Sequence, residues 1–492
     1  MGDDDEKLGA GTAWVGIASG LSGILDLVTT AACLWLWLST EELGTATLAG
    51  ALLPVIERLA NAGMSSALVR WGDGDRRVLS TLLWLATATS CAVLATLIVL
   101  GPSIGRAFGA PIIGGLLLGY GAKLVVQNAY IVPEALLRRE LRFDRLTRVR
   151  IAASTGDAIA KLVAAYLGAH GHPALRIWCF VIGPLANGVV TLIGIQLCRP
   201  WRPALAFDRA VAAAGLRYGA QIAGGELLYY GYTNADYVVI GAVWGKAAVG
   251  AYRLAYELVL DVVRLISLVT AEVAFPAFAR PGIDERAGAL LIRFTRQNAI
   301  ALVPVVAFLA VEAGDLLAVL YPPLGPAATT AARILCMVGG LRMLSFVLPA
   351  MLTGLGHAGD ALRYQAVACV LLPAAFALAA HLAPGAGYVA VAWAWAAGYP
   401  LAFGVLLERA LVRGRVRLAS YLRSVAGVLA CGAGAAAAAI AVHAVLPGPP
   451  IGRLVAVAAV IVAIYTGLIA RVERITPRSI LRAIRGTVEP GA

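Results

Sequence analysis

Charged side chains are scarce in this chain. Only 14% of its 492 residues are Asp, Glu, Lys or Arg, whereas 60% are hydrophobic. The mean hydropathy is +0.82. A water-soluble fold of this composition would lack the polar surface needed to cover itself, so most of the chain must be solvated by lipid. The composition therefore predicts an all-α integral membrane protein.

Several catalytic and metal-binding signatures are missing. The sequence has no GxxxxGK[ST], HExxH or GxSxG motif. Gly354, Gly356 and Gly359 spell GxGxxG, but no strand precedes them, and we interpret them as a turn. The seven cysteines lie scattered in apolar runs, which favours packing over disulfide or metal roles. We expect no cofactor, no metal and no catalytic residue.

Fourteen apolar runs are each long enough to cross a membrane as a helix, which takes about 20 mostly apolar residues. Short polar breaks separate them, so no segment is long enough for a catalytic domain outside the membrane. We expect these helices at residues 14–38, 45–69, 78–100, 112–137, 151–167, 175–197, 212–243, 249–275, 289–310, 328–351, 362–382, 388–411, 421–446 and 451–470.

Lys and Arg outnumber Asp and Glu by 40 to 28. The basic residues gather in alternate loops, and the largest group lies between Arg138 and Arg150. This segment is either an amphipathic helix along the lipid headgroups or a plain basic loop. Basic loops stay on the cytoplasmic side of a membrane, so the alternation predicts that both termini are cytoplasmic. The positive charge thus indicates topology rather than a nucleic-acid partner.

A weak internal repeat appears at an offset of 206 residues. Gly44, Leu48, Ala49, Leu52, Arg58 and Leu59 then align with Gly250, Leu254, Ala255, Leu258, Arg264 and Leu265. Internal repeats are typical of transporters. We expect two pseudo-symmetric six-helix bundles, at residues 1–210 and 211–411, followed by two additional helices and a cytoplasmic tail at 412–492.

Ionised side chains lie in the middle of several predicted helices. Each costs at least about 2.5 to 3.5 kcal/mol there, so each needs a partner, water or a function. They are Asp26, Glu57, Arg58, Lys123, Asp157, Lys161, Glu226, Glu257, Asp261, Arg264 and Arg342.

Two polar stripes follow from the spacing of these residues. Arg253, Glu257, Asp261 and Arg264 step by four, four and three residues, and Glu226, Tyr230, Thr233 and Tyr237 are spaced alike. Such stripes indicate a hydrated cavity between helices. The alternative is a set of buried ion pairs that only fix the packing: Asp157 with Lys161, Glu257 with Arg253, and Asp261 with Arg264.

The cations in this set are suited to an anionic headgroup, because guanidinium groups grip phosphate through two hydrogen bonds. A pyrophosphate is the ligand that we expect. The carboxylates Asp26, Glu226, Glu257 and Asp261 are candidates for binding the protons or Na⁺ that drive the cycle. The nearby tyrosines Tyr229, Tyr230 and Tyr232 either stack on sugar rings or pack between helices.

Three stretches of the chain resemble a known family. They are VPEALLRRELRFDR at 132–145, WRPALAFD at 201–208 and NADYVVIGAVWGKAAVGAYRLAYELV at 234–259. They are similar to the polysaccharide flippases, which include O-antigen and exopolysaccharide exporters. That family lies in the superfamily that also holds the MATE multidrug exporters and the lipid II flippases. The resemblance covers residues 8 to 411.

The resemblance implies a V-shaped pair of six-helix bundles around a cavity that opens alternately to each side. It implies a polyprenyl-pyrophosphate-linked oligosaccharide as cargo, flipped from the cytoplasmic to the periplasmic leaflet of the bacterial inner membrane. It also implies a functional link to a polysaccharide polymerase and glycosyltransferases. Cavity cations hold the pyrophosphate in this family, a role that falls by position to Arg58, Lys123, Lys161, Arg253 and Arg264.

Two other functions remain as alternatives. A cation-coupled multidrug antiporter would use an acidic residue on the first helix, for which Asp26 is the candidate. A membrane enzyme such as a polysaccharide ligase or polymerase would need a large periplasmic loop, and the predicted outward loops are all short. The sequence therefore favours a transporter over an enzyme.

Overall fold

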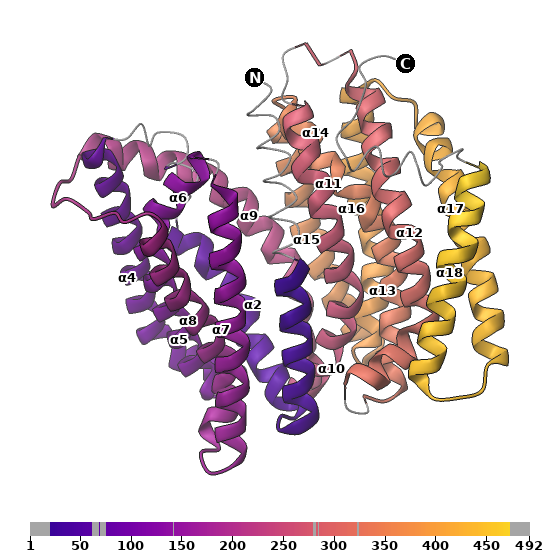
Figure 1. The fold of residues 1–492 in the computed structure, drawn as a ribbon, viewed down its shortest axis with the longest axis horizontal. Coiled ribbons are helices and arrows are strands. Elements are labelled where there is room, and N and C mark those ends of the chain that lie inside the picture. Colours follow the sequence, from indigo (N-terminus) through magenta and orange to yellow (C-terminus); the bar gives the residue numbers. More distant parts are fainter. Residues whose placement is uncertain are drawn as a thin grey trace. The chain divides into compact units, whose positions relative to one another are not determined.

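The structure is a computed structural model that describes residues 20–61, 68, 75–140, 142–278, 282–283, 285–321 and 324–472. Every regular element in these residues is a helix (Figure 1). The chain divides into two compact units, Met1–Arg253 and Leu254–Ala492. The expected all-helical architecture is confirmed. The count of fourteen crossing helices and the domain boundaries at residues 210 and 411 stay predictions.

The length and apolar character of its helices make this a multi-pass membrane protein. Ten helices in the described residues are long and apolar enough to cross a membrane, and the apolar helix Gly20–Leu36 is shorter. Large apolar side chains such as Leu197, Val99 and Val370 are more than 70% exposed, as expected for surfaces that face lipid.

The first unit begins, in the described residues, with the helix Gly20–Leu36. It continues with α2 (Thr40–Asn61), α4 (Arg76–Ala107), α5 (Ile112–Ala129), α6 (Ile131–Arg139), α7 (Phe143–Ala169), α8 (Ala174–Cys198), α9 (Arg209–Trp244) and the greater part of α10 (Lys246–Tyr256). Aspartates cap two of these helices: Asp75 accepts a hydrogen bond from the Arg77 N–H, and Asp208 accepts from Ala210 and Val211. Such caps satisfy N–H groups that the first turn leaves free.

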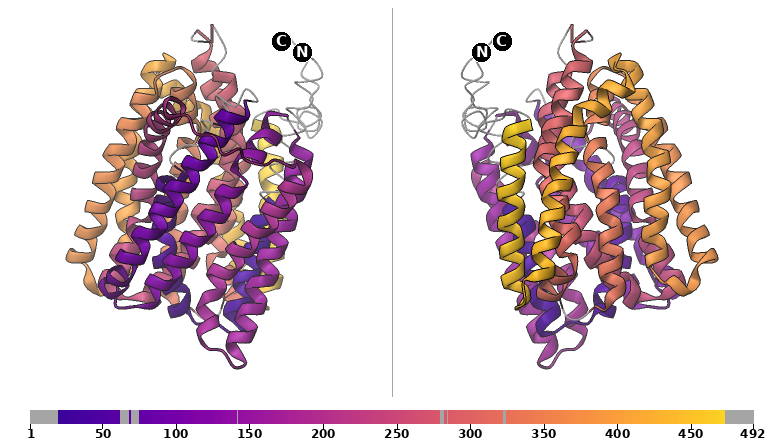
Figure 2. Two further views of the ribbon diagram at one scale, coloured as in Figure 1. Left: turned by 90° about the vertical axis from the view of Figure 1, so that its left-hand side faces the viewer. Right: turned by 90° about the vertical axis from the view of Figure 1, so that its right-hand side faces the viewer.

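The second unit follows the end of α10. It holds a π-helical turn, η1 (Glu257–Asp261), then α11 (Val262–Phe278), α12 (Ala287–Leu320), α13 (Pro326–Ser345), α14 (Val347–Gly354), α15 (Ala358–Leu382), the 3₁₀ turn η2 (Pro384–Ala386), α16 (Val389–Gly414), α17 (Leu418–Val445) and α18 (Pro450–Val472). Both α17 and α18 pack on α12, and they lie side by side at one edge of this unit (Figures 1 and 2).

Two predicted helices are each broken into two segments by a proline. The run 112–137 splits after Ala129, and the run 328–351 splits after Ser345. Pro133 and Pro349 lie four residues beyond these ends. A proline ring clashes with the carbonyl four residues earlier and cannot donate to it, which favours a break at these points, whereas α4 and α12 continue through Pro102 and Pro304.

The basic segment between Arg138 and Arg150 is mostly helical. Helix α6 ends at Arg139, and α7 begins at Phe143, eight residues before the predicted start at 151. The plain-loop alternative is therefore wrong for residues 143–150. The predicted turn at Gly354–Gly359 is confirmed between α14 and α15, where Gly356 takes a positive φ of 81°.

Helices α2 and α10 approach each other backbone to backbone. A Cβ atom on Gly44 would collide with the carbonyl oxygen of Lys246, and one on Gly250 would collide with that of Thr40. Thr40 and Lys246, like Gly44 and Gly250, are separated by the 206-residue offset of the proposed repeat. The contact is thus reciprocal between repeat-related residues, which supports the repeat at this point of the chain.

The predicted helix at 249–275 contains the π turn η1. A π turn holds more residues than an α turn, so it shifts the phase between the residues before and after it. The face predicted for Arg253, Glu257, Asp261 and Arg264 assumed an unbroken α-helix, and that assumption is wrong. Turns of this kind occur frequently at functional sites.

Candidate functional site: buried charges in each unit

Lys161 on α7 is the centre of a charged cluster in the first unit. It is only 5% exposed and forms an ion pair with Asp26 of the helix Gly20–Leu36. Its ammonium also lies 3.9 Å from a carboxylate oxygen of Asp157. The predicted pair of Asp157 with Lys161 is therefore present, but Asp26, 135 residues away in sequence, is the nearer partner.

Arg253 on α10 contacts α2 in the same unit. Its guanidinium donates a hydrogen bond of 3.0 Å to the Thr47 hydroxyl. The predicted pairing of Arg253 with Glu257 stays a prediction.

A second ion pair of the first unit joins α5 to α2. The Lys123 ammonium lies 2.8 Å from Glu57, and these side chains are 20% and 26% exposed. In apolar surroundings each charged group loses its hydrating water, and attraction to the opposite charge offsets part of that cost. Lys123, like Lys161, therefore has a carboxylate partner from another helix.

Arg58 on α2 contacts an aromatic cluster on α9. Its Nη2 lies 3.5 Å from the Tyr230 hydroxyl, and its guanidinium carbon lies 5.5 Å from the centre of that ring. Tyr229 packs edge to face against Tyr230 and Tyr232, with centroids 5.2 and 5.5 Å apart. The packing alternative for these tyrosines is thus observed, and stacking on sugar remains a proposal.

One buried carboxylate of the first unit did not enter the predicted site. Asp236 on α9 is fully buried and accepts a 3.0 Å hydrogen bond from the Tyr252 hydroxyl. The only signal in the sequence was an Asp inside an apolar run. Glu226, predicted as a coupling carboxylate on the same helix, has a side chain outside the described residues.

In the second unit, Arg264 on α11 pairs with Asp261, as the spacing predicted. The two groups are 3.0 Å apart, and their side chains are 40% and 34% exposed. Arg342 on α13 is 3% exposed and donates a hydrogen bond to the Tyr256 hydroxyl. Its guanidinium also lies 5.5 Å from the Trp395 ring centre, a cation–π geometry.

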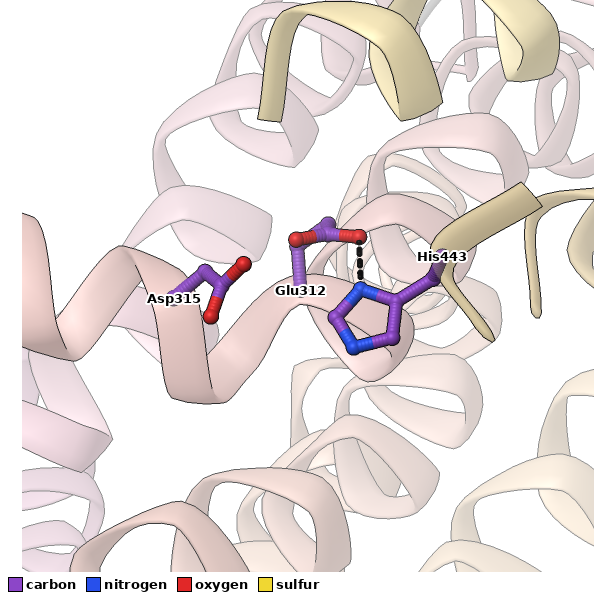
Figure 3. Close-up of side chains that lie close together, drawn as sticks. All are labelled: Glu312, Asp315 and His443. Carbon is purple, nitrogen blue, oxygen red and sulfur yellow. Dashed lines mark hydrogen bonds and ion pairs between the residues drawn. The ribbon is translucent and has the colours of Figure 1, made fainter. Parts of the chain in front are cut away.

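A further polar group ties α17 and α18 to α12 (Figure 3). His443 Nδ1 lies 2.8 Å from Glu312, whose side chain is fully buried. Asp315 gives one oxygen to Nε and one to Nη2 of Arg453, at 2.7 and 2.8 Å. Glu312, Asp315 and His443 have the spacing of a metal site. Because Arg453 occupies both oxygens of Asp315, we interpret the group as an Asp315–Arg453 ion pair beside a hydrogen-bonded pair of Glu312 and His443.

The predicted site residues thus fall into local groups. Asp26, Asp157 and Lys161 share one cluster, and Glu57 with Lys123, Arg58 with Tyr230 and Arg253 with Thr47 form three others, all in the first unit. Glu257, Asp261 and Arg264 lie in the second unit. Convergence of all five cations on one chamber stays a prediction, as does the absence of any metal or cofactor.

Comparison with known proteins identifies the family. A family model described as polysaccharide biosynthesis protein matches residues 37–322, more than half of the chain. The chain belongs to this family. The resemblance to polysaccharide flippases found in the sequence is therefore confirmed.

Curated relatives of this polysaccharide biosynthesis protein include the lipopolysaccharide biosynthesis protein WzxC of Escherichia coli (strain K12), 22% identical over 78% of this chain and 77% of that protein. The amylovoran biosynthesis protein AmsL of Erwinia amylovora is 24% identical over 63% of this chain and 79% of that protein. The teichuronic acid biosynthesis protein TuaB of Bacillus subtilis (strain 168) is 25% identical over 68% of each chain.

Solved structures show the fold of this family member. The lipid II flippase MurJ in an inward closed conformation matches with a TM-score of 0.71 and 13% identity, covering 93% of this chain and 98% of that chain. An inward-facing MATE multidrug transporter of the MOP superfamily matches with a TM-score of 0.61 and 18% identity, covering 81% and 96%. The chain accordingly shares the fold of these membrane proteins, and its family and relatives confirm the expectation that it is not an enzyme.

Proposed function

We propose that this protein moves a polyprenyl-pyrophosphate-linked oligosaccharide from the cytoplasmic to the periplasmic leaflet of the bacterial cytoplasmic membrane, for polysaccharide biosynthesis. Family membership and the relatives named for lipopolysaccharide, amylovoran and teichuronic acid biosynthesis support this cargo class. The shared fold with a lipid II flippase supports transport of a lipid-linked sugar. The protein works by alternating access of two six-helix bundles, with both termini in the cytoplasm, alongside a polymerase and glycosyltransferases.

In this proposal the pyrophosphate is held by Arg58, Lys123, Lys161, Arg253 and Arg264. The observation that carries it is the cluster around Lys161, a buried ammonium with two carboxylates beside it. Phosphate oxygens and carboxylate oxygens compete for the same ammonium, because both accept charge-assisted hydrogen bonds. The Lys161 ammonium can therefore bind the cargo once its ion pair with the carboxylate is broken.

A proton on Asp26 would make that exchange possible. Protonation removes one of the two negative charges beside Lys161, so its ammonium can bind an anion more tightly. Loss of the proton restores the ion pair and weakens the hold on the pyrophosphate. Asp26 is suited to this role because its side chain is 60% exposed, although it pairs with a buried lysine. Glu226, Glu257 and Asp261 are the other coupling candidates, with H⁺ or Na⁺ as the ion.

The test removes the charge at Arg58 or Arg264 by substitution with alanine. Export of polysaccharide in cells should be lost while the lipid-linked precursor accumulates in the membrane and the protein still inserts. Arg148→Ala is the matched control, because Arg148 is a helical arginine whose side chain is 74% exposed. Normal export in both the Arg58→Ala and Arg264→Ala cells would remove the headgroup-binding role.

A cation-coupled multidrug antiporter is the second candidate, favoured by Asp26 on the first described helix and by the match to a MATE transporter. It predicts that cells lacking the gene become sensitive to cationic drugs while their polysaccharide export stays normal. The flippase predicts the reverse pair of phenotypes. Measuring both in one deletion strain separates the two functions.

A further inference from the structure

A pair of cysteines meets between two helices of the first unit. Cys33 lies near the end of the helix Gly20–Leu36, and Cys179 lies near the start of α8. Both side chains are 0% exposed, and their thiol groups are joined by a hydrogen bond. None of the transport steps proposed above uses them. The sequence favoured packing for all seven cysteines, and this contact singles out one pair.

A second contact between the same two helices fixes their register. The Arg176 guanidinium on α8 donates a hydrogen bond of 2.6 Å to the Trp37 carbonyl. Trp37 lies one helical turn after Cys33, whose carbonyl accepts its N–H, and Arg176 lies one turn before Cys179. The helices therefore run antiparallel here, with contacts at matching turns. Helix packing itself holds the two thiols against each other.

The location of the pair favours oxidation. With both termini in the cytoplasm, as proposed, the end of the helix Gly20–Leu36 and the start of α8 face the periplasm. At a rise of 1.5 Å per residue, the two cysteines lie about 5–8 Å inside these ends. Disulfides form and persist in the bacterial periplasm, whereas cytosolic thiols are kept reduced. The contact thus lies near the oxidising side of the membrane.

We propose that a disulfide joins Cys33 to Cys179 and fastens the helix Gly20–Leu36 to α8. This rests on the topology of the proposed function but not on its cargo. The oxidant is a periplasmic protein that donates its own disulfide. In contact, the two thiols need only small side-chain rotations to bring their sulfurs to the bonding distance of about 2.05 Å.

The exchange takes two steps. The Cys33 thiolate attacks one sulfur of the donor, which forms a mixed disulfide and releases one donor thiolate. The Cys179 thiolate then attacks the Cys33 sulfur, which forms the Cys33–Cys179 bond and releases the second donor thiolate. The donor gains two electrons, and the two protons lost by the cysteines end on its thiols.

Burial sets the timing and the durability of the bond. Both thiols are buried in the folded protein, so the exchange takes place while the helices are still assembling. Only a thiolate attacks a disulfide, and an apolar interior disfavours that form. Once the helices pack, the same burial keeps reductants away. The bond should therefore resist reductant in the native protein and be reduced after denaturation.

The bond secures the helix that carries Asp26. An ion pair of Asp26 with Lys161 holds that helix on α7. The hydroxyls of Ser22 and Ser154 add a hydrogen bond of 2.7 Å between the same helices. The proposed cycle breaks the ion pair when Asp26 takes up a proton. A covalent tether to α8 does not depend on protonation, so it keeps the helix in place through that step.

The first test counts free thiols in cells. The full-length chain is expressed in a bacterium, and the cells are quenched with trichloroacetic acid, which protonates thiols and stops exchange. The denatured protein is alkylated with N-ethylmaleimide and weighed by mass spectrometry before and after reduction. All cysteines but Cys33 and Cys179 should be alkylated before reduction, and one cross-linked peptide should contain both. Alkylation of all seven cysteines without reduction, or a bond to another cysteine, would overturn the proposal.

A second measurement separates the bond from the topology. His172→Cys places a thiol in the loop between α7 and α8, where a membrane-impermeant maleimide added to intact cells should label it above the level of the unchanged chain. Without this labelling, the topology is wrong and the oxidising location falls with it. Labelling in the absence of a disulfide would refute the bond alone. Cells that lack their periplasmic thiol oxidase should lose the bond, and an unchanged yield there would overturn the oxidant.

Stability shows what the bond does. Cys33→Ala and Cys179→Ala should each lower the Tm of the purified protein to the same extent, and the double variant should fall little further, because each change removes the same bond. Unchanged protein from oxidase-deficient cells should share the lower Tm. Cys179→Ala is the matched control, since its Tm should not depend on the host. A Tm of the unchanged chain that is equal from both hosts would overturn the tether.

Discussion

The close approach of α2 and α10 gives the sharpest prediction for stability. Replacing Gly44 by alanine places a methyl group against the carbonyl oxygen of Lys246, and Gly250→Ala does the same against Thr40. Both obstacles are backbone atoms, which cannot rotate away as a side chain can. Small residues at such crossings let backbones approach closely in membrane helices. Each substitution must therefore push the two helices apart.

Two opposing effects set the magnitude. Alanine is favoured over glycine inside a helix by about 0.5–1 kcal/mol. Overpacking costs about 1–3 kcal/mol, and a rigid contact lies toward the upper end of that range. The net loss should be about 1–2 kcal/mol. Because about 1 kcal/mol corresponds to about 2–4 °C in a domain of 150–250 residues, Tm should fall by several degrees.

The control lies in the same helix. A Cβ on Gly50 would have no heavy atom within 4 Å, so Gly50→Ala should leave Tm unchanged or raise it. The assay is thermal unfolding of the purified protein in one detergent. The double variant of Gly44 and Gly250 should lose less than the sum of the single losses, because the first methyl already separates the backbones. A Tm for Gly44→Ala at or above that of Gly50→Ala, or fully additive losses, would refute the reasoning.

Three further predictions concern buried polar contacts. Asp26→Asn should lower stability by about 1–3 kcal/mol, a range that allows for solvent screening at the exposed Asp26 side chain. Exchanging the two residues, as Asp26→Lys with Lys161→Asp, should restore Tm. If the exchange also restores export, Asp26 has no coupling role. His443→Ala should cost about 1–3 kcal/mol, because it removes the hydrogen-bond partner of the buried Glu312 carboxyl group, and adding Glu312→Gln should recover part of this loss in Tm. Asn298, fully buried, donates hydrogen bonds to Ser267 and to the Met343 carbonyl, so Asn298→Ala should cost about 1–3 kcal/mol in thermal unfolding; a change below 0.5 kcal/mol would contradict that account.

The positions of the helices were predictable because lipid imposes a local rule on the sequence. An apolar run of sufficient length must bond its backbone internally, so the run itself predicts a helix. The breaks after Ala129 and Ser345 were not predicted, because α4 and α12 continue through Pro102 and Pro304 and a proline alone therefore does not locate a break. The π turn at Glu257–Asp261 has no comparable signal, because nothing in that stretch forbids an α-helix.

The partners of the buried charges were predictable only when they lay one turn apart. Asp157 with Lys161 and Asp261 with Arg264 follow from helical spacing. Asp26 with Lys161 and Glu312 with His443 join residues 135 and 131 positions apart. Such pairs depend on how helices pack, which the periodicity of one helix does not report. Spacing therefore found the charged groups but not most of their partners.

The buried cations differ in the chemistry of their partners. Arg342 lies against aromatic side chains, with Tyr256, Trp395 and Tyr399 around its guanidinium, an arrangement that packs a cation as part of the core. Lys161 and Lys123 instead face carboxylates, which can take up a proton and so release their lysine. A transport cycle needs a site whose charge changes between its steps. In the proposed cycle the lysine–carboxylate pairs of the first unit are suited to that need, whereas Arg342, which is 3% exposed and enclosed by aromatic side chains, is not.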